Sequence, residues 1–398
     1  MVPEGWEKYL VGKICKSIVP GRNKPNVFDG DIPWVTTPEI KGRYVPSIRQ
    51  VNYVSEVVLK EAGGKVVPAG AVIMAAVGEL GLVALASQPV VLNQQLHAFV
   101  CSDHVYNEYL AYWLETQKPY MESIASKTTI PYLNKTNCES IPVLTPPIPE
   151  QKKIAKILST WDKAITTTEQ LLANSQQQKK ALMQQLLTGK KRLLDENGER
   201  FQGEWKKVRL GTVADMNSGG TPKSNIEEYY GGNIPWVSIA DMTKQGKWIA
   251  STEKYLTELG LENSSARIYP KNSVLYAMYA SIGECSIAEV PLSSSQAILG
   301  IRPKSGLNFE FLYFFLTSLK ERIKLQGQQG TQSNLNAGMV KGFHLYLPNM
   351  EEQKKIAAVL SSADQEITNL QQRLEHLKQE KKALMQQLLA GKRRVQVN

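Results

Sequence analysis

The chain has 398 residues, and 42% of them are hydrophobic, which is enough for about two to four domains with apolar cores. This composition excludes a collagen, a low-complexity disordered chain and a small disulfide-stapled protein. Lys and Arg number 47 against 37 Asp and Glu, so the net charge is +10 and an anionic partner, either nucleic acid or a membrane surface, is favoured.

Residues 1–148 are predicted to form a first globular domain of mixed α/β type. Short β-rich runs alternate with Gly, Pro and Asn turns, and residues 107–123 have the apolar spacing of a helix. The predicted strands lie at 51–59, 71–76 and 82–86.

Residues 149–192 are expected to form one long helix. Apolar residues recur every three or four positions, which is the heptad spacing of a helix that packs along another helix. The predicted seam of this helix consists of Leu158, Trp161, Ile165, Leu172, Leu182 and Leu186. Gly189 is expected to end the helix, because glycine readily adopts the left-handed conformation with which many helices terminate.

A polar linker, residues 193–204, leads to a second copy of the same arrangement. Residues 205–348 are predicted as a second mixed α/β domain, with strands at 273–279 and 344–347 and a helix at 308–324. Residues 349–392 are predicted as a second long helix, and residues 393–398 as a basic tail. The seam of the second helix consists of Leu360, Ile367, Leu370, Leu374, Leu377, Leu384 and Leu388.

The two halves form an internal repeat. EQKKIAKILS at 150–159 recurs as EQKKIAAVLS at 352–361, and KKALMQQLLTGK at 179–190 recurs as KKALMQQLLAGK at 381–392, both with an offset of 202 (352 − 150 and 381 − 179). Because repeats determine architecture, we expect an α+β fold: two globular mixed α/β domains joined by two long helices that form an antiparallel coiled coil about a pseudo-twofold axis. The alternative, in which each helix packs only on its own globular domain, stays open at this point.

The segment 66–86 is apolar over nearly the ~20 residues that cross a bilayer. Its counterpart in the second repeat, residues 268–288, contains Lys271 and Glu284. We therefore expect buried strands at both places and no membrane partner. The N-terminus lacks a basic stretch followed by an apolar one, so we expect no secretory signal and a cytoplasmic protein.

No motif typical of catalysis is present in the sequence. Phosphate-binding and dinucleotide-binding glycine patterns are absent, and the four cysteines and four histidines are scattered. Asp31, Glu39 and Lys41 resemble the acidic and basic set of a Mg²⁺-dependent nuclease, but the second repeat lacks the lysine and one of the acids. We expect no catalytic residue, no metal site and no cofactor in this chain; a stand-alone nuclease and a coiled-coil scaffold without DNA binding are the alternatives.

Polar loops with glycines or basic residues occur at matched places in the two repeats. Lys, Arg, Ser and Thr suit phosphate oxygens, whereas Asn and Gln can pair with adenine and Arg with guanine. The sequence therefore predicts two DNA-binding loops in each repeat. The predicted DNA-binding residues are Arg22, Asn23, Lys24, Lys127, Thr128, Thr129, Thr221, Lys223, Ser224, Asn225, Gln328, Gln329, Thr331, Gln332 and Ser333.

The order of variable half, shared helix, variable half and shared helix resembles the specificity (S) subunits of type I restriction–modification systems. The resemblance covers the whole chain. It is carried by Gly5-Trp6, Ile32-Pro33-Trp34-Val35, the string PEQKKIA at 149–155, the string KKALMQQLLTGK at 179–190, and their copies.

This resemblance implies that each variable half is a target recognition domain that reads one part of a split, asymmetric site in double-stranded DNA. It implies that the shared helices set the spacer between the two parts and dock two modification subunits, which carry S-adenosylmethionine and methylate adenine at N6. Restriction subunits, which use ATP and Mg²⁺, would join the same complex. The S subunit itself would have no catalytic residue.

Overall fold

The structure is a computed structural model that describes residues 2–21, 23–47, 52–126, 129–328 and 335–396, apart from the side chains of 324–328. The chain divides into two compact units. Unit 1 comprises Met1–Glu169 and Arg373–Asn398, and unit 2 comprises Gln170–Gln372. Each unit thus contains one globular domain, part of the helix that follows it, and part of the helix from the other repeat.

Unit 1 contains two sheets and a two-stranded ribbon. The larger sheet has the order β2 (Cys15–Ile18), β10 (Leu96–Cys101), β7 (Val72–Ala75), β8 (Val83–Ala86) and β4 (Tyr44–Val45). The smaller sheet has the order β5 (Tyr53–Val54), β3 (Ile32–Val35), β9 (Val90–Leu92) and β6 (Val66–Val67), and β1 (Glu7–Leu10) pairs with β11 (Pro142–Thr145). The short helices are α1 (Val11–Ile14), η1 (Thr37–Glu39), α2 (Glu56–Glu61), α3 (Asn107–Thr116), α4 (Lys118–Ile124) and α5 (Lys135–Glu139).

The central strands β7 and β8 are apolar throughout because both faces of the sheet are covered. Val72 and Leu85 face the cluster that contains α3, whereas Ile73 and Ala84 face a second cluster with residues of the smaller sheet. A strand that is buried on both faces cannot alternate polar and apolar residues. Segment 66–86 is therefore three strands of a globular domain. Among the described residues, no helix is both long enough and apolar enough to cross a bilayer.

Unit 2 repeats this plan. Its five-stranded sheet has the order β13 (Ala214–Ser218), β20 (Ile298–Pro303), β17 (Val274–Ala277), β18 (Cys285–Ala288) and β15 (Trp248–Ile249). A three-stranded sheet has the order β16 (Lys254–Leu256), β14 (Tyr230–Val237) and β19 (Ser293–Ser294), and β12 (Lys206–Arg209) pairs with β21 (His344–Leu347). The short helices are α7 (Leu210–Val213), η2 (Glu227–Tyr229), α8 (Ile239–Gln245), α9 (Glu258–Glu262) and α11 (Ala337–Lys341), and α10 (Phe309–Gln328) is longer.

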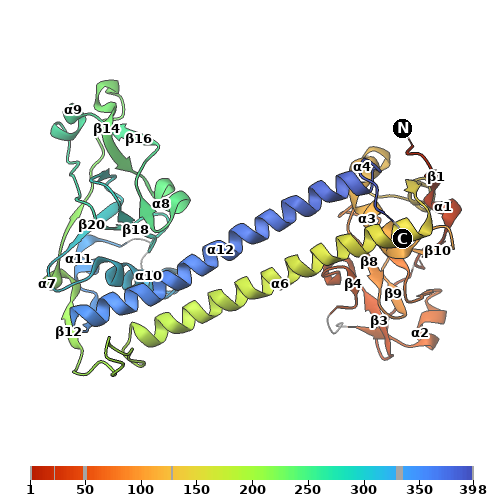
Figure 1. The fold of residues 1–398 in the computed structure, drawn as a ribbon, viewed down its shortest axis with the longest axis horizontal. Helices are drawn as coiled ribbons and strands as arrows, with labels where there is room; N and C mark the ends of the chain where they lie inside the picture. The colour runs from red at the N-terminus through yellow and green to blue at the C-terminus, as the bar shows by residue number, and fades with distance from the viewer. Residues whose placement is uncertain (1, 22, 48–51, 127–128, 329–334, 397–398) are drawn as a thin grey trace. The chain divides into compact units, whose positions relative to one another are not determined.

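The two long helices are α6 (Ile148–Leu186) and α12 (Met350–Leu388), each of 39 residues, and each continues from one unit into the other. Within unit 1 the first part of α6 packs along the last part of α12, where Lys381 pairs with Asp162 at 2.5 Å and Lys378 with Glu169 at 2.7 Å. Within unit 2 the last part of α6 packs along the first part of α12, where Lys179 pairs with Asp364. Within each unit the two helices are therefore antiparallel, as the ribbon in Figure 1 also shows.

The helix ends also complete the cores of the globular domains. Leu388 and Leu389 of the second repeat lie in the apolar cluster of unit 1 with Trp6, and Leu186 and Leu187 of the first repeat lie in that of unit 2. The arrangement in which each helix packs only on its own domain is therefore wrong. The expected α+β tandem repeat with a pair of antiparallel helices is confirmed.

Both long helices end before the last residues predicted for them. After Leu186, Gly189 has φ +70°, and the amide of Lys191 donates to the carbonyl of Gln185 at 3.1 Å. Gly391 has φ +65° and the amide of Arg393 donates to Gln387 at 3.2 Å. In both helices the hydrogen bond joins residues six positions apart around a glycine in the left-handed conformation, which commonly ends a helix. Helices α6 and α12 therefore stop short of residues 192 and 392.

Two short segments also differ from the prediction. The expected strand 51–59 is β5 followed by α2, because the Ser55 side chain accepts a hydrogen bond from the Val58 amide and so caps a helix; residue 51 lies outside the described part. The expected helix 107–123 is two helices, α3 and α4, that meet at Gln117. Pro119 explains the break, because proline has no amide hydrogen for a continuing helix.

Candidate nucleic-acid interface

The first predicted loop of unit 2, residues 219–225, lies against the segment that leads into β20. The amide of Gly219 donates to Ile298 at 3.0 Å, and that of Gly220 donates to Ser294 at 2.9 Å. The Thr221 hydroxyl donates to the Gln296 side chain. A Cβ atom on Gly219 would lie 2.2 Å from the Ser294 carbonyl oxygen, so this close approach requires glycine.

The residue that follows the second predicted loop of unit 2 is held near the same segment. Leu335, which follows the loop, donates its amide to Met278 at 3.0 Å, and Met278 donates to Ala297 at 2.9 Å. Segment 294–298 therefore holds the base of both loops. The first loop and the residue that follows the second loop therefore lie at one edge of the domain.

Unit 1 holds its second loop in the same way. Leu133 donates its amide to Ala76 at 2.7 Å, and Ala76 donates to Gln95 at 2.8 Å. Its first loop lies beside α2, since a Cβ on Gly21 would be 2.6 Å from the Gly63 carbonyl oxygen. The Lys24 ammonium there lies 5.7 Å from the centre of the Phe28 ring.

All seven predicted DNA-binding residues whose side chains are described are exposed to solvent. These are Asn23, Lys24, Thr129, Thr221, Lys223, Ser224 and Asn225. The other predictions fall on Arg22, Lys127, Thr128, Gln329, Thr331, Gln332 and Ser333, which lie outside the described residues, and on Gln328, the last residue of α10, whose side chain is not described.

Ser224 also lines a hollow of about 500 Å³ that the sequence alone did not indicate. Its walls include Tyr230 of β14 and Lys254 and Tyr255 of β16. Burial raises the pKa of Tyr230, so its hydroxyl remains a donor, and it donates to the Pro222 carbonyl at 2.8 Å. The sequence signal was Gly231-Gly232, because a Cβ on Gly232 would lie 2.3 Å from the Leu256 carbonyl oxygen.

The thirteen seam residues predicted from the heptad spacing are all buried or half-buried. Where the heptad positions carry lysine, the charge has a carboxylate partner on the facing helix within the same unit. Lys381 pairs with Asp162 in unit 1, and Lys179 pairs with Asp364 in unit 2. The role of the paired long helices as a spacer stays a prediction.

The repeated Glu-Gln pair at the start of each long helix ties that helix to its domain. Gln151 is fully buried; its side chain accepts a hydrogen bond from the Tyr106 amide at 2.7 Å and donates to the Pro146 carbonyl at 2.8 Å. Gln353 accepts from the Asn308 amide at 2.8 Å and donates to Pro348 at 2.9 Å. The two glutamines make equivalent hydrogen bonds, so the recurrence of the Glu-Gln pair is explained by the packing of each long helix on its domain.

The neighbouring glutamates form a matched pair of ion clamps. In unit 2, Arg192 donates to both oxygens of Glu352 at 2.6 and 2.7 Å, and the Trp205 indole donates at 3.2 Å. In unit 1, Arg394 and Trp6 surround Glu150 in the same way. Each arginine follows the end of one helix and binds the start of the other.

A second polar network fixes the domain of unit 1 to its helices. Asp162 of α6 accepts from the Tyr112 hydroxyl at 2.5 Å and lies 3.5 Å from an Arg43 nitrogen. Arg43 also pairs with Glu115 at 2.9 Å, where burial raises the pKa of the Glu115 carboxyl and the guanidinium opposes that shift. Lys247 has the corresponding place in unit 2 and pairs with Glu310 at 2.8 Å.

The sequence pattern of the family described as "Type I restriction modification DNA specificity domain" matches residues 3–174 and 202–379. The chain belongs to this family. The two matched ranges are the two repeats, so the domain occurs twice.

Several proteins similar to this chain are named specificity subunits of type I restriction enzymes. The MjaIX subunit of Methanocaldococcus jannaschii is 33% identical over 169 residues, which are 42% of this chain and 39% of that protein. The EcoR124I/EcoR124II subunit of Escherichia coli is 27% identical, over 65% of this chain and 63% of that protein. The chain thus spans less than two thirds of these two, whereas the match to the MjaVIII subunit of M. jannaschii, at 28% identity, covers 99% of this chain and 94% of that protein.

Two solved structures share the fold. The type I restriction–modification S subunit from M. genitalium superposes with a TM-score of 0.62 at 16% identity, over 97% of this chain and 96% of that one. A chain from a study of complex assembly and conformational transition of the type I R-M system gives a TM-score of 0.60 at 19% identity, over 98% of both chains.

One of the nuclease-like residues, Glu39, has a structural role. Both the amide and the hydroxyl of Thr36 donate to Glu39, at 2.8 and 2.6 Å, which caps η1. In the second repeat Ser238 donates to Asp241 in the same way at 2.9 and 2.6 Å. Within the described residues, no group of three His, Cys, Asp or Glu side chains could hold a metal ion.

Proposed function

We propose that this chain is the DNA-recognition subunit of a type I restriction–modification enzyme. Each unit would read one half of a bipartite, asymmetric site in double-stranded DNA. The observation that carries the proposal is the duplicated specificity domain, together with the exposed polar residues of the first loop in each unit, Asn23 and Lys24 in unit 1 and Lys223 and Asn225 in unit 2. Linking two readers in one chain makes the second contact intramolecular and strengthens binding.

We further propose that the paired helices set the unread spacer and dock two modification subunits. Those subunits would supply S-adenosylmethionine and adenine-N6 methylation, and restriction subunits would supply ATP- and Mg²⁺-dependent cleavage. The chain itself would contribute recognition without catalysis, in the cytoplasm where the chromosome is accessible. The roles of Glu39 and Asp241 as helix caps support this assignment over a stand-alone nuclease.

The test is an exchange of residues 1–148 for the corresponding residues of another specificity subunit, followed by genome-wide mapping of methylated adenines with the modification subunit present. We expect one half of the methylated site to change and the other half to stay the same. The matched exchange of residues 205–348 should change the other half. A single exchange that alters both halves would contradict separate reading by the two units.

A further inference from the structure

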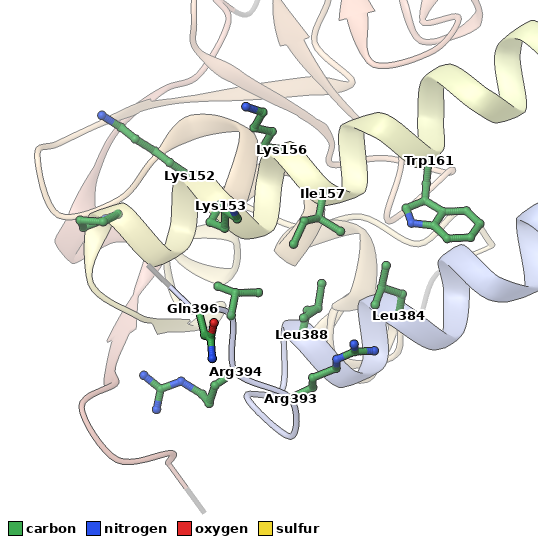
Figure 2. Close-up of a pocket in the computed structure, with 12 residues that line it drawn as sticks. Lys152, Lys153, Lys156, Ile157, Trp161, Leu384, Leu388, Arg393, Arg394 and Gln396 are labelled. Atoms are coloured by element: carbon green, nitrogen blue, oxygen red, sulfur yellow. The ribbon is translucent and has the colours of Figure 1, made fainter. Parts of the chain in front are cut away.

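A basic groove of about 840 Å³ lies within unit 1, where the start of α6, the end of α12 and the C-terminal tail meet. Figure 2 shows Ile157 and Trp161 of α6 on one side, opposite Leu384 and Leu388 of α12. These four side chains make an apolar floor. The rim is formed by Lys152, Lys153, Lys156, Arg393 and Arg394.

The charges of this rim are largely uncompensated. Arg394 is held by Glu150, but Lys152, Lys153, Lys156 and Arg393 have no ion pair among the described residues. An apolar floor inside an uncompensated basic rim favours a ligand that carries both apolar groups and negative charge.

Unit 2 shows what covers the corresponding surface. There the linker folds back as a hairpin: Leu194 bridges Arg200, and the amide of Phe201 donates to Leu193 at 3.0 Å. The ammonium of Lys355, the counterpart of Lys153, donates to the Asp195 carbonyl at 3.2 Å. Lys355 is half-buried under this contact, whereas Lys153 is exposed.

The hairpin of unit 2 is acidic. Residues 194–200 contain Asp195, Glu196 and Glu199 against one arginine. Its turn is closed by the Asp195 carboxylate, which accepts the amides of Asn197 and Glu199 at 2.9 Å each. In unit 1, Val395 and Gln396, the counterparts of Leu193 and Leu194, line the groove.

We propose that the basic groove of unit 1 binds an acidic, turn-forming peptide segment of another polypeptide chain, in the way that unit 2 binds its own linker. The groove is more basic than its counterpart, because Lys156 stands where unit 2 has Ala358, and more apolar, because Trp161 stands where unit 2 has Ala363. Both differences favour the binding of a segment that carries acidic and apolar side chains.

A peptide fits the groove better than a nucleic acid does. A DNA backbone needs phosphate contacts along an exposed basic surface, whereas this floor is made of Ile157, Trp161, Leu384 and Leu388 between two helices. The internal counterpart of the ligand is itself a peptide. The proposal does not depend on what the loops of either unit recognise.

The experiment uses the full chain and a fluorescein-labelled peptide with the sequence of residues 193–202, Leu-Leu-Asp-Glu-Asn-Gly-Glu-Arg-Phe-Gln. Fluorescence anisotropy should show saturable binding with a Kd on the order of 100 μM, weakening as salt is added. The double variant Lys153→Glu/Lys156→Glu should weaken binding at least tenfold. A peptide in which Asp195, Glu196 and Glu199 are replaced by the amides should lose affinity to a similar extent.

The matched control is Lys180→Glu/Lys354→Glu, which makes the same change of charge at two exposed lysines outside the groove. This variant should bind the peptide as the parent chain does. The absence of saturable binding, or equal binding to the groove variant and the parent, would overturn the proposal. A short DNA duplex whose affinity falls tenfold in the groove variant, while peptide binding is unchanged, would assign the groove to nucleic acid instead.

Discussion

Arg394 and Glu150 are 244 residues apart, and the guanidinium donates to both carboxylate oxygens of Glu150 at 2.8 Å. Arg192 and Glu352 repeat this relationship in unit 2. Each pair joins the end of one long helix to the start of the other. Glu352 is fully buried and Arg192 is 19% exposed, so the pair of unit 2 is shielded from solvent.

Arg192→Ala should destabilise unit 2 by about 3 kcal/mol, because it leaves the buried carboxylate of Glu352 without its cation. Arg192→Met/Glu352→Met should recover part of this loss, since it removes both charges. Urea denaturation monitored by tryptophan fluorescence measures the free energy of unfolding of the single and the double variant. Equal losses in the single and double variants would show that the ion pair is not the source of the effect.

The lysine within the seam of unit 2 should depend on its partner. Lys179→Asp places two carboxylates together beside the Phe314 ring and should cost about 2 kcal/mol. Adding Asp364→Lys restores opposite charges and should recover at least half of this cost. The double-mutant cycle from urea unfolding gives the coupling energy, and a coupling near zero would contradict a direct pair.

His97 should make unit 1 sensitive to mild acid. Burial lowers the pKa of His97 below its ordinary value of 6.5, nearby Glu139 opposes this shift, and His97 Nδ1 has no hydrogen-bond partner among the described residues. Because the unfolded chain takes up the proton more readily, the stability present above pH 6.5 is lost as the pH falls toward the folded pKa.

His97→Leu is the matched variant, since the second repeat has Leu299 at the corresponding position. We expect the urea midpoint of the parent to fall between pH 7.5 and 5.5 by more than that of His97→Leu. Identical pH dependence in the two proteins would exclude His97 as the titrating group.

Lys24 and Lys223 should contribute to DNA binding without regard to sequence. Replacing either by Gln removes a charge from an exposed loop, and it should lower affinity on every duplex alike and reduce the salt slope by about 0.9 for each lost phosphate contact. Lys180→Gln is the control, because Lys180 is exposed on α6 away from the loops. A change in the preferred sequence without a uniform loss of affinity would assign base contacts to the lysine.

The proposed spacer role predicts the effect of lengthening both helices. One heptad inserted after Glu169 in α6 and one after Gln372 in α12 fall at the boundaries between the units, so the contacts within each unit are kept. Each insertion adds ~10 Å of helix rise, and the unread spacer should lengthen by up to about three base pairs, at 3.4 Å each.

Insertions of two residues at the same places are the control, because they turn the seam away from its partner and should damage folding. The measurement is methylation mapping with the modification subunit present. An unchanged spacer in an active protein with the heptad insertions would show that the helices do not set the distance.

The repeat, the long helices and their seams could be predicted from the sequence because each is a local pattern. Heptad spacing depends on residues three and four positions apart. The matching strings in the two repeats identify which residues are equivalent. Short elements were predicted less well, since one side chain decides them: the Ser55 cap turned half of an expected strand into α2.

Two similar domains and two helices with apolar seams could be inferred from the amino-acid sequence alone. The three-dimensional packing was needed to show that Leu388 and Leu389 complete the core of the first domain, that Arg394 binds Glu150, and that segment 294–298 contacts the first loop of unit 2. The reason is that these contacts join residues far apart in the chain. No periodicity encodes such contacts, and they are selected by which packing buries the apolar seams and pairs the buried charges.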